Sequence, residues 1–215
     1  MVAGFRSGIF MTLRLLAAMA AATVLALPAQ AARAPAAPTK DAKLWAAAEA
    51  ARPGQLKLLE DVVNVDSGTG DVEGGRKIAA ILSARLKAMG YAIESVKAEA
   101  EGLPDNTVAT LTGTGKGRVL LIGHIDTVFE PGTVAKRPFR MDADKAYGPG
   151  VSDEKGGVIE GIYALQLLHD LGFKDFKQIV FLIETSEERG SPGIGLEKGY
   201  EHDQVKFLIG ATLSQ

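Results

Sequence analysis

The segment Val119–Asp126 constrains the fold of this chain more strongly than any other stretch. It reads Val-Leu-Leu-Ile-Gly-His-Ile-Asp, so a short apolar run ends at Gly123 and two polar residues follow almost at once. An apolar run of this length predicts a strand that is buried on both faces. His124 and Asp126 are two residues apart, so they share one side if the chain stays extended. In open α/β sheets, the ends of such strands are where ligands bind.

The surrounding sequence alternates between helical and strand patterns, which predicts a sheet with helices on its faces. Helical spacing covers the region before Ser67, although Pro53-Gly54 is expected to interrupt it. A second helix is expected from the N-cap Asp71 to Met89. Further elements are expected at Tyr91–Val96, Asn106–Leu111, 158–171, Gln178–Glu184, 194–200 and 205–209. The glycine-rich run at 112–117 lacks the phosphate-loop pattern and precedes a strand, so we interpret it as a hairpin turn.

The composition suits a globular protein and narrows the classes of partner. Hydrophobic residues make up 47% of the 215 residues, and this length suits one domain or a domain with part of a second. The net charge of −2 gives no reason to expect nucleic acid or an anionic membrane as partner. The absence of cysteine excludes disulfides, thiol nucleophiles and zinc sites built from cysteine.

The first 31 residues differ from the rest and have the layout of a secretory signal peptide. Arg6 and Arg14 precede the apolar run Leu15–Leu27, and a cleavage signal of the Ala-x-Ala type ends at Ala31. The alternative is a single membrane anchor, for which the apolar run is short. We therefore expect a signal peptide, then a flexible Ala/Pro-rich linker at 32–40, and a periplasmic or secreted location with no membrane partner after cleavage.

Three separate loops carry side chains that commonly bind metal ions. His124 and Asp126 follow the central strand, Asp153 lies in a glycine-rich loop before a helix, and Glu187 and Glu188 follow the next strong strand. Strand ends of such a sheet share one edge, so these loops can converge. His124 and Glu188 fit the role of ligands, and Asp153 fits that of a bridge between two ions. Asp126 fits the role of orienting His124, and Glu187 that of a general base.

Each of these residues also has an explanation without a metal. A histidine after a strand is often an ordinary loop residue, and Asp153 taken alone is better explained as a cap of the following helix. Neighbouring glutamates such as Glu187 and Glu188 are common as solvated charge at a helix start. His169 and His202 are assigned to no site, because one lies on the polar side of a helix and the other in a charged loop. The metal site is favoured because three separate loops each carry side chains that commonly bind metal ions.

The three loops form long motifs, namely Gly-His-Ile-Asp-Thr-Val, Tyr-Gly-Pro-Gly-Val-Ser-Asp-Glu-Lys-Gly-Gly and Glu-Thr-Ser-Glu-Glu-Arg-Gly-Ser. In this order and spacing, they closely resemble the co-catalytic zinc peptidases of the M20 family. That family includes acetylornithine deacetylase, succinyl-diaminopimelate desuccinylase and glutamate carboxypeptidase, and the nearest similarity is to periplasmic glutamate carboxypeptidases. The resemblance runs from about Gln55 to about Ile209, which is nearly all of the chain after the predicted signal peptide.

The resemblance implies a three-layer α/β sandwich with a mixed, mostly parallel sheet that holds two zinc ions. It implies hydrolysis of a C-terminal peptide or amide bond in a small peptide or N-acyl amino acid, with glutamate as a possible leaving residue. By motif match, His124 binds one zinc ion, Asp153 bridges both ions and Glu188 binds the other. Asp126 orients His124, and Glu187 is the base that activates the attacking water.

Parts of the family pattern are missing from this sequence. The family places another acidic ligand where this chain has Gly210, and a last histidine ligand and a lid or dimerisation domain beyond it. We therefore expect residues 41–215 to be a truncated, N-terminal part of the catalytic domain, without the lid or the homodimer surface and with little or no activity of its own. The alternative is a non-catalytic remnant that binds only metal or a partner. A nucleotide-binding domain is disfavoured by the lack of a phosphate loop.

Overall fold

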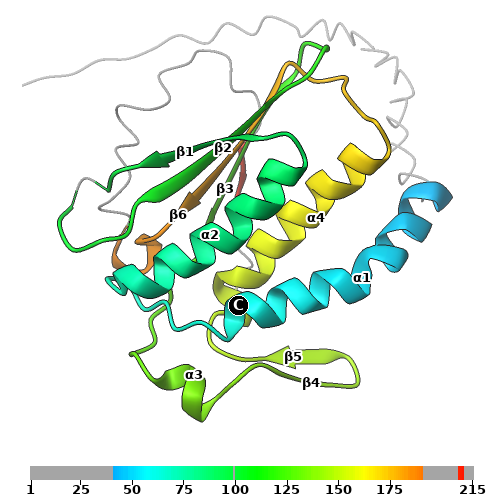
Figure 1. The fold of residues 1–215 in the computed structure, drawn as a ribbon. Helices are drawn as coiled ribbons and strands as arrows, with labels where there is room; N and C mark the ends of the chain where they lie inside the picture. The colour runs from blue at the N-terminus through cyan, green and yellow to red at the C-terminus, as the bar shows by residue number, and fades with distance from the viewer. Residues whose placement is uncertain (1–40, 99, 191–207, 211–215) are drawn as a thin grey trace, which may run out of the picture. The chain divides into compact units, whose positions relative to one another are not determined.

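The computed structural model describes residues 41–98, 100–190 and 208–210, which form an α/β fold (Figure 1). The helices are α1 (Ala42–Val63), α2 (Val72–Ala88), the short α3 (Thr133–Lys136) and α4 (Gly156–Asp170). The strands are β1 (Ala92–Val96), β2 (Asn106–Thr112), β3 (Arg118–His124), β4 (Arg140–Asp142), β5 (Lys145–Tyr147), β6 (Gln178–Glu184) and β7 (Leu208–Gly210). Two turns, η1 (Val151–Lys155) and η2 (Glu187–Arg189), precede α4 and follow β6.

The main sheet is mixed, with the strand order β1-β2-β6-β3-β7. The pairs β1–β2 and β2–β6 are antiparallel, whereas β3–β6 and β3–β7 are parallel. The predicted mixed α/β fold is confirmed, and parallel and antiparallel pairs are equally frequent among the described strands of this sheet. In the parallel pair β3–β6, His124 lies opposite Glu184. The loops that follow these two strands therefore start side by side.

The predicted hairpin turn at 112–117 is wrong, because β2 and β3 are not neighbours. β6 lies between them, antiparallel to β2 and parallel to β3. The connecting loop instead pairs with the loop before β6, where the backbone N–H groups of Gly113 and Gly115 donate to the carbonyls of Lys177 and Phe176. The residues at 112–117 suit a turn whether β2 and β3 pair as a hairpin or are separated by another strand. Only the position of β6, which comes later in the sequence, decides between these two arrangements.

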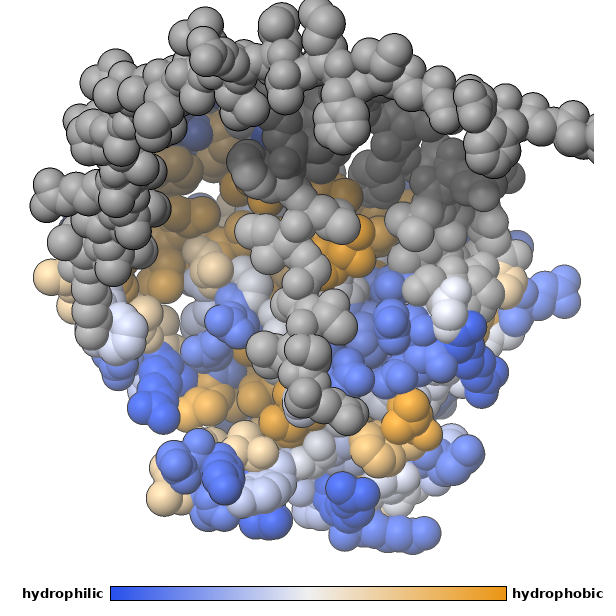
Figure 2. Space-filling view, turned by 180° about the vertical axis from the view of Figure 1, so that it is seen from behind, coloured by the Kyte–Doolittle hydropathy of each residue, from blue (hydrophilic) through white to orange (hydrophobic). Residues whose placement is uncertain are grey.

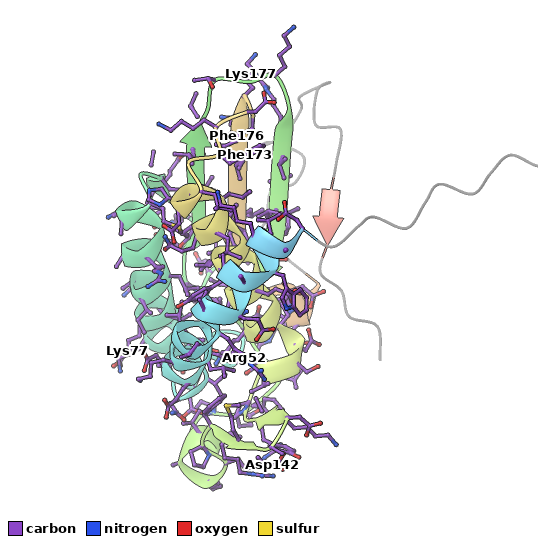
Figure 3. All side chains as sticks on the ribbon, turned by 90° about the vertical axis from the view of Figure 1, so that its right-hand side faces the viewer. Arg52, Lys77, Asp142, Phe173, Phe176 and Lys177 are labelled. Carbon is purple, nitrogen blue, oxygen red and sulfur yellow. The ribbon has the colours of Figure 1, made fainter. Side chains whose placement is uncertain are left out.

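One helical layer packs against one face of the sheet. Figures 1 and 3 show α2 and α4 lying along the strands on the same side, and α1 packs against α4. Ile78, Leu82 and Leu86 form a stripe on α2 that is completely buried. This four-residue spacing repeats one face of a helix, so the stripe and the apolar side of α4 make the core with β2 and β6.

The opposite face of the sheet also carries apolar side chains. Ile179, Phe181 and Ile183 of β6 belong to the core under the helices, so the alternating residue Leu182 points to the other side. Figure 2 shows hydrophobic residues on this face where no grey atoms cover them. The described helices lie against only one face of the sheet, so the described residues supply two of the three predicted layers.

The N-terminal helix runs unbroken through Pro53, which corrects the predicted interruption at Pro53-Gly54. α1 bends along its length without ending (Figure 1). Gly54 lies so close to α4 that an added Cβ would stand 2.8 Å from the hydroxyl oxygen of Tyr163. Packing against α4 therefore holds both halves in one helix, and this stabilisation outweighs the backbone hydrogen bond that proline removes.

The polar stretch after β3 contains structure that the sequence pattern did not predict. It forms α3 and the antiparallel pair β4–β5.

The structure confirms several of the other predicted elements, namely the strands at Gln178–Glu184 and Asn106–Leu111 and the N-cap Asp71. The predicted signal peptide, the linker at 32–40 and the helix at 194–200 lie outside the described residues. No helix within the described ranges combines the length and apolar character that crossing a membrane requires.

Candidate metal centre

His124 is the last residue of β3, and its ring is buried at the carboxyl edge of the sheet. Its Nδ1 atom lies 3.2 Å from Asp126 Oδ1, so the two side chains meet as their spacing predicts. The Nε2 atom points the other way and faces the loops that follow. Burial alone lowers the pKa of His124, but the hydrogen bond to Asp126 and the nearby negative charges outweigh it and raise the pKa to about 9.

Asp126 connects the loops that surround the site. Its Oδ2 atom accepts hydrogen bonds from the Thr69 hydroxyl at 2.6 Å and from the backbone N–H of Glu188 at 3.2 Å. Its Oδ1 atom accepts from the backbone N–H of Glu187 at 3.1 Å. Burial acts to raise the pKa of Asp126, but the hydrogen bonds from His124 and Thr69 outweigh it and hold the pKa below its usual value. The carboxylate is therefore charged at neutral pH and fixes these segments against one another.

Asp153 reaches the site from the loop between β5 and α4. Its Oδ1 atom lies 3.2 Å from His124 Nε2, and 73% of its side chain is exposed. The N-cap of α4 is Lys155, and no side chain caps this helix. The interpretation of Asp153 as a helix cap is therefore wrong. The loop turns at Gly150, whose φ of +77° suits glycine and whose added Cβ would stand 2.7 Å from Thr127 Cγ2.

Glu187 and Glu188 lie in η2, directly after β6. A carboxylate oxygen of Glu188 joins His124 and Asp153 in a group whose ligand atoms all lie within 4.8 Å of one another. Burial raises the pKa of Glu188, and the negative charge of Asp153 adds to this effect. Glu187 stands beside the group, with Oε2 3.8 Å from His124 Nε2 and half of its side chain exposed. The structure thus brings together all five residues that the sequence analysis selected, while their roles stay predictions.

The donor set of this group fits a divalent cation. An imidazole nitrogen with carboxylate oxygens is a common zinc set, with bonds of about 2.0–2.2 Å, so ligand atoms around one ion stand roughly 3–3.5 Å apart. His124 Nε2 and Asp153 Oδ1 already have this separation. Several carboxylates surround the single imidazole, and a cation relieves their mutual repulsion. Three protein ligands leave a coordination position open, which is typical of catalytic sites.

Two buried residues next to Asp153 support the site and were not selected from the sequence. Glu154 Oε1 accepts the backbone N–H of His124 at 3.0 Å. Lys155 is only 1% exposed, and its ammonium group donates to the backbone oxygen of Val65 at 2.9 Å. Burial lowers the pKa of Lys155 to about 8. Their charges gave a weak signal in the sequence, because a charged pair in a glycine-rich loop is usually solvated.

A cavity of about 800 Å³ opens beside Glu188. The loop after α1, the loop after β3 and the turn η2 line it, and Thr69, Phe129 and Arg189 are among its residues. This volume lies in the range of small-molecule sites. Glu188, one of the three candidate ligands, therefore stands at the wall of a space that can admit a substrate of modest size.

Comparisons with known proteins show similarity to peptidases in sequence. Residues 120–215 match the sequence family described as Peptidase family M20/M25/M40. Carboxypeptidase G2 from Pseudomonas sp. (strain RS-16) is 41% identical over 154 residues, which are 72% of this chain and 37% of that protein. Beta-Ala-Xaa dipeptidase from Lactobacillus delbrueckii subsp. lactis is 31% identical over 168 residues, or 75% of this chain and 35% of that protein. The chain thus spans little more than a third of the length of these relatives.

The fold is also similar to that of human carnosine dipeptidase 1. The two structures superpose with a TM-score of 0.60 and 23% sequence identity, over 71% of this chain and 36% of the other. At this identity the likeness concerns the fold alone. The mixed sheet and its helices therefore share the architecture of that structure.

Proposed function

We propose that this chain is a member of peptidase family M20/M25/M40, whose sequence model matches residues 120–215, and that it carries part of the active site of a metal-dependent hydrolase of peptide or amide bonds. The observation that carries the proposal is the group formed by His124, Asp153 and Glu188. These residues come from three loops at one edge of the sheet, and their ligand atoms all lie within 4.8 Å of one another. Zinc is the proposed ion, because the set combines imidazole with carboxylate.

The roles of the residues follow from their positions. A divalent ion held by this group supplies Lewis-acid activation of the scissile carbonyl and of water. Glu187 stands beside the group without joining it, so we assign to it the transfer of a proton from the attacking water to the leaving amine. Asp126 holds the His124 ring through Nδ1 and keeps Nε2 directed at the ligand group. The cavity beside Glu188 gives the substrate access to these residues.

The proposed substrates are small peptides or N-acyl amino acids, cleaved to release the C-terminal residue. The similarity to a carboxypeptidase supports release from the C-terminus, and the similarity to a dipeptidase supports a short substrate. Glutamate is the proposed leaving residue, and its support is the resemblance of the three motifs to glutamate carboxypeptidases. We place this activity in the periplasm or outside the cell, on the support of the signal-peptide pattern in residues 1–31.

A second candidate function is metal binding without turnover. The described residues contain one three-ligand group, which is sufficient for one ion, whereas the related enzymes named above are about three times as long as the matched segment. Hydrolysis by two ions needs further ligands. On this alternative, the chain binds one ion and a substrate-sized molecule but does not cleave it.

The test combines zinc titration with a hydrolase assay on the purified chain. Four variants are compared with the unmodified protein, namely His124→Ala, Glu187→Gln and the controls His169→Ala and Glu160→Gln. The control residues are an exposed histidine and an exposed glutamate of α4, and neither belongs to the candidate ligand group. The substrates are N-acylated glutamate, an N-acylated neutral amino acid and a dipeptide with β-alanine.

We expect stoichiometric zinc binding that His124→Ala abolishes and His169→Ala leaves intact. Cleavage that Glu187→Gln removes, without loss of zinc and without an effect of Glu160→Gln, supports the hydrolase. Zinc binding without cleavage of any substrate supports the second candidate. Failure of the unmodified chain to bind zinc or cobalt refutes both.

A further inference from the structure

The loop Ser67–Asp71, which connects α1 to α2, lies alongside the segment that follows β3. The backbone N–H of Thr69 donates to the carbonyl of Thr127, and the N–H of Thr127 donates to the carbonyl of Ser67. Gly68 and Thr127 form a parallel bridge between the two segments. The loop is therefore fixed against the segment that follows His124 and contains Asp126.

Thr69 is the residue of this loop that reaches the site itself. Its side chain is 9% exposed, and its hydroxyl donates to Asp126 Oδ2 at 2.6 Å. The same oxygen accepts the backbone N–H of Glu188, while Oδ1 accepts that of Glu187 and lies 3.2 Å from His124 Nδ1. Each carboxylate oxygen thus has two partners, which uses the approximate hydrogen-bonding capacity of an ionised carboxylate.

This arrangement fixes the rotation of the Asp126 carboxylate from four directions. Three of the four partners belong to residues of the candidate metal centre or its base, and they come from β3 and η2. Thr69 is the fourth, and it comes from a segment that contributes no ligand. Without its hydroxyl, Oδ2 keeps one donor and the carboxylate can rotate. Such a rotation shifts both the His124 ring and the backbone of η2.

We propose that Thr69 is a positioning residue, whose hydroxyl sets the orientation of Asp126 and thereby the geometry of His124, Glu187 and Glu188. The metal-related part of this inference rests on the proposed function. Thr69 lines the cavity, but its hydroxyl donates to Asp126 Oδ2 and Thr69 is not one of the candidate ligands, so we infer that the hydroxyl acts through Asp126. The contribution is one of placement, because carboxylates that hold a ligand histidine set the direction of the ring.

A purely structural role for Thr69 predicts different behaviour, and Ser67 provides the matched control. Ser67 lies in the same loop, is 3% exposed and donates its hydroxyl to the backbone oxygen of Ile125 at 2.8 Å. Removing either hydroxyl breaks one buried hydrogen bond between the same two segments. Only the hydroxyl of Thr69 touches the Asp126 carboxylate, so a loss of general stability affects both variants, whereas a loss of positioning affects one.

The experiment compares Thr69→Val, Thr69→Ser and Ser67→Ala with the unmodified chain. Valine keeps the shape of threonine without the donor, and serine keeps the donor. The first readout is the set of amide proton and nitrogen chemical shifts of Glu187 and Glu188 in metal-free protein, measured by NMR. The second readout is the affinity for zinc, and the third is the thermal unfolding midpoint.

We expect Thr69→Val to shift both amide signals and to weaken zinc binding by about 10- to 100-fold, the usual effect of removing a partner of a ligand. Thr69→Ser restores both readouts. Ser67→Ala lowers the unfolding midpoint but leaves the two amide signals and the zinc affinity close to those of the unmodified chain. If Thr69→Val does not fold, Thr69→Cys takes its place, because a thiol is only a weak donor.

Unchanged amide signals in Thr69→Val, or equal losses of zinc affinity in Thr69→Val and Ser67→Ala, overturn the inference. Failure of the unmodified chain to bind zinc counts against the proposed function. In that case the amide signals of the metal-free protein still decide whether Thr69 positions Asp126, so the two failures are distinguishable.

Discussion

Replacing Gly123 by alanine tests whether Glu154 and Val158 pack against the backbone next to His124 as the structure indicates. Gly123 precedes His124 in β3, and an added Cβ would stand 2.6 Å from Glu154 Oε1 and 2.9 Å from Val158 Cγ2. Both distances are shorter than ordinary contacts. The buried Glu154 carboxylate accepts the backbone N–H of His124 through the same oxygen, so the new methyl group displaces that acceptor.

The magnitude follows from two effects on the free energy of unfolding. Loss of a buried hydrogen bond to a charged group costs about 1.5–3 kcal/mol. Crowding of a packed interior by one methyl group costs about 1–3 kcal/mol. We therefore expect Gly123→Ala to lower the free energy of unfolding by roughly 2.5–6 kcal/mol, which is a large part of the stability of a domain of this size.

Urea unfolding followed by circular dichroism measures this change, and a double-mutant cycle assigns its cause. If the methyl group collides with Glu154, the variant Glu154→Ala removes the collision, so the double variant is more stable than the sum of the two single effects predicts by about 1 kcal/mol or more. The control is Gly117→Ala, because Gly117 has no atom within 4 Å of an added Cβ. We expect no loss in the control, since alanine at a permissive glycine position is neutral or stabilising.

Additive effects of Gly123→Ala and Glu154→Ala would show that Glu154 does not lie beneath Gly123. A loss no greater than that of the Gly117→Ala control would refute the packing argument as a whole. Only this second result removes the structural reason for a glycine immediately before His124, because the contact with Val158 does not depend on Glu154.

Three further outcomes are expected. Burial raises the pKa of Tyr91, so the contribution of this residue to the free energy of unfolding is intact below about pH 10 and declines above it by up to about 1.4 kcal/mol per pH unit. Unfolding measured as a function of pH should therefore show a shallower decline for Tyr91→Phe than for the unmodified chain. Ile162 is completely buried in α4, so Ile162→Ala should lower the free energy of unfolding by about 2–5 kcal/mol in urea titrations, and a loss below 1 kcal/mol contradicts its place in the core. Zinc at about 100 times its dissociation constant should raise the free energy of unfolding by about 2.7 kcal/mol, a gain that a chelator reverses; a similar gain in His124→Ala argues against the assigned site.

Apolar runs and capping residues correctly predicted those helices and strands that do not depend on distant parts of the chain. The apolar run at Gln178–Glu184 is a strand within the predicted bounds, and Asp71 caps α2 by accepting the N–H of Gly74. The prediction failed where packing decides. α1 continues through Pro53 because α4 supports it, and the turn after β2 is no hairpin because β6 inserts between β2 and β3.

The same distinction holds at the candidate centre. His124, Asp153 and Glu188 were selected because metal-type side chains follow buried strands or open a helix, and the structure brings their ligand atoms together. Asp126 and Glu187 were selected for the same reason and lie beside the group. Glu154 and Lys155 were not selected, because residue type alone does not reveal that a charge is buried.

The sequence by itself determined which residues stand at the ends of the buried strands, since the length and period of apolar runs are local properties. Only the tertiary structure decided what holds those residues in place. Thr69 and Asp126 are 57 positions apart, and Asp126 and Glu187 are 61 apart. The hydrogen bond of the first pair forms only once the loop between α1 and α2 lies against the segment after β3. The hydrogen bond of the second pair forms only once β3 and β6 lie in register, because the sheet brings their loops to one edge. The ligands are therefore visible in the sequence, whereas their orientation is a property of the fold.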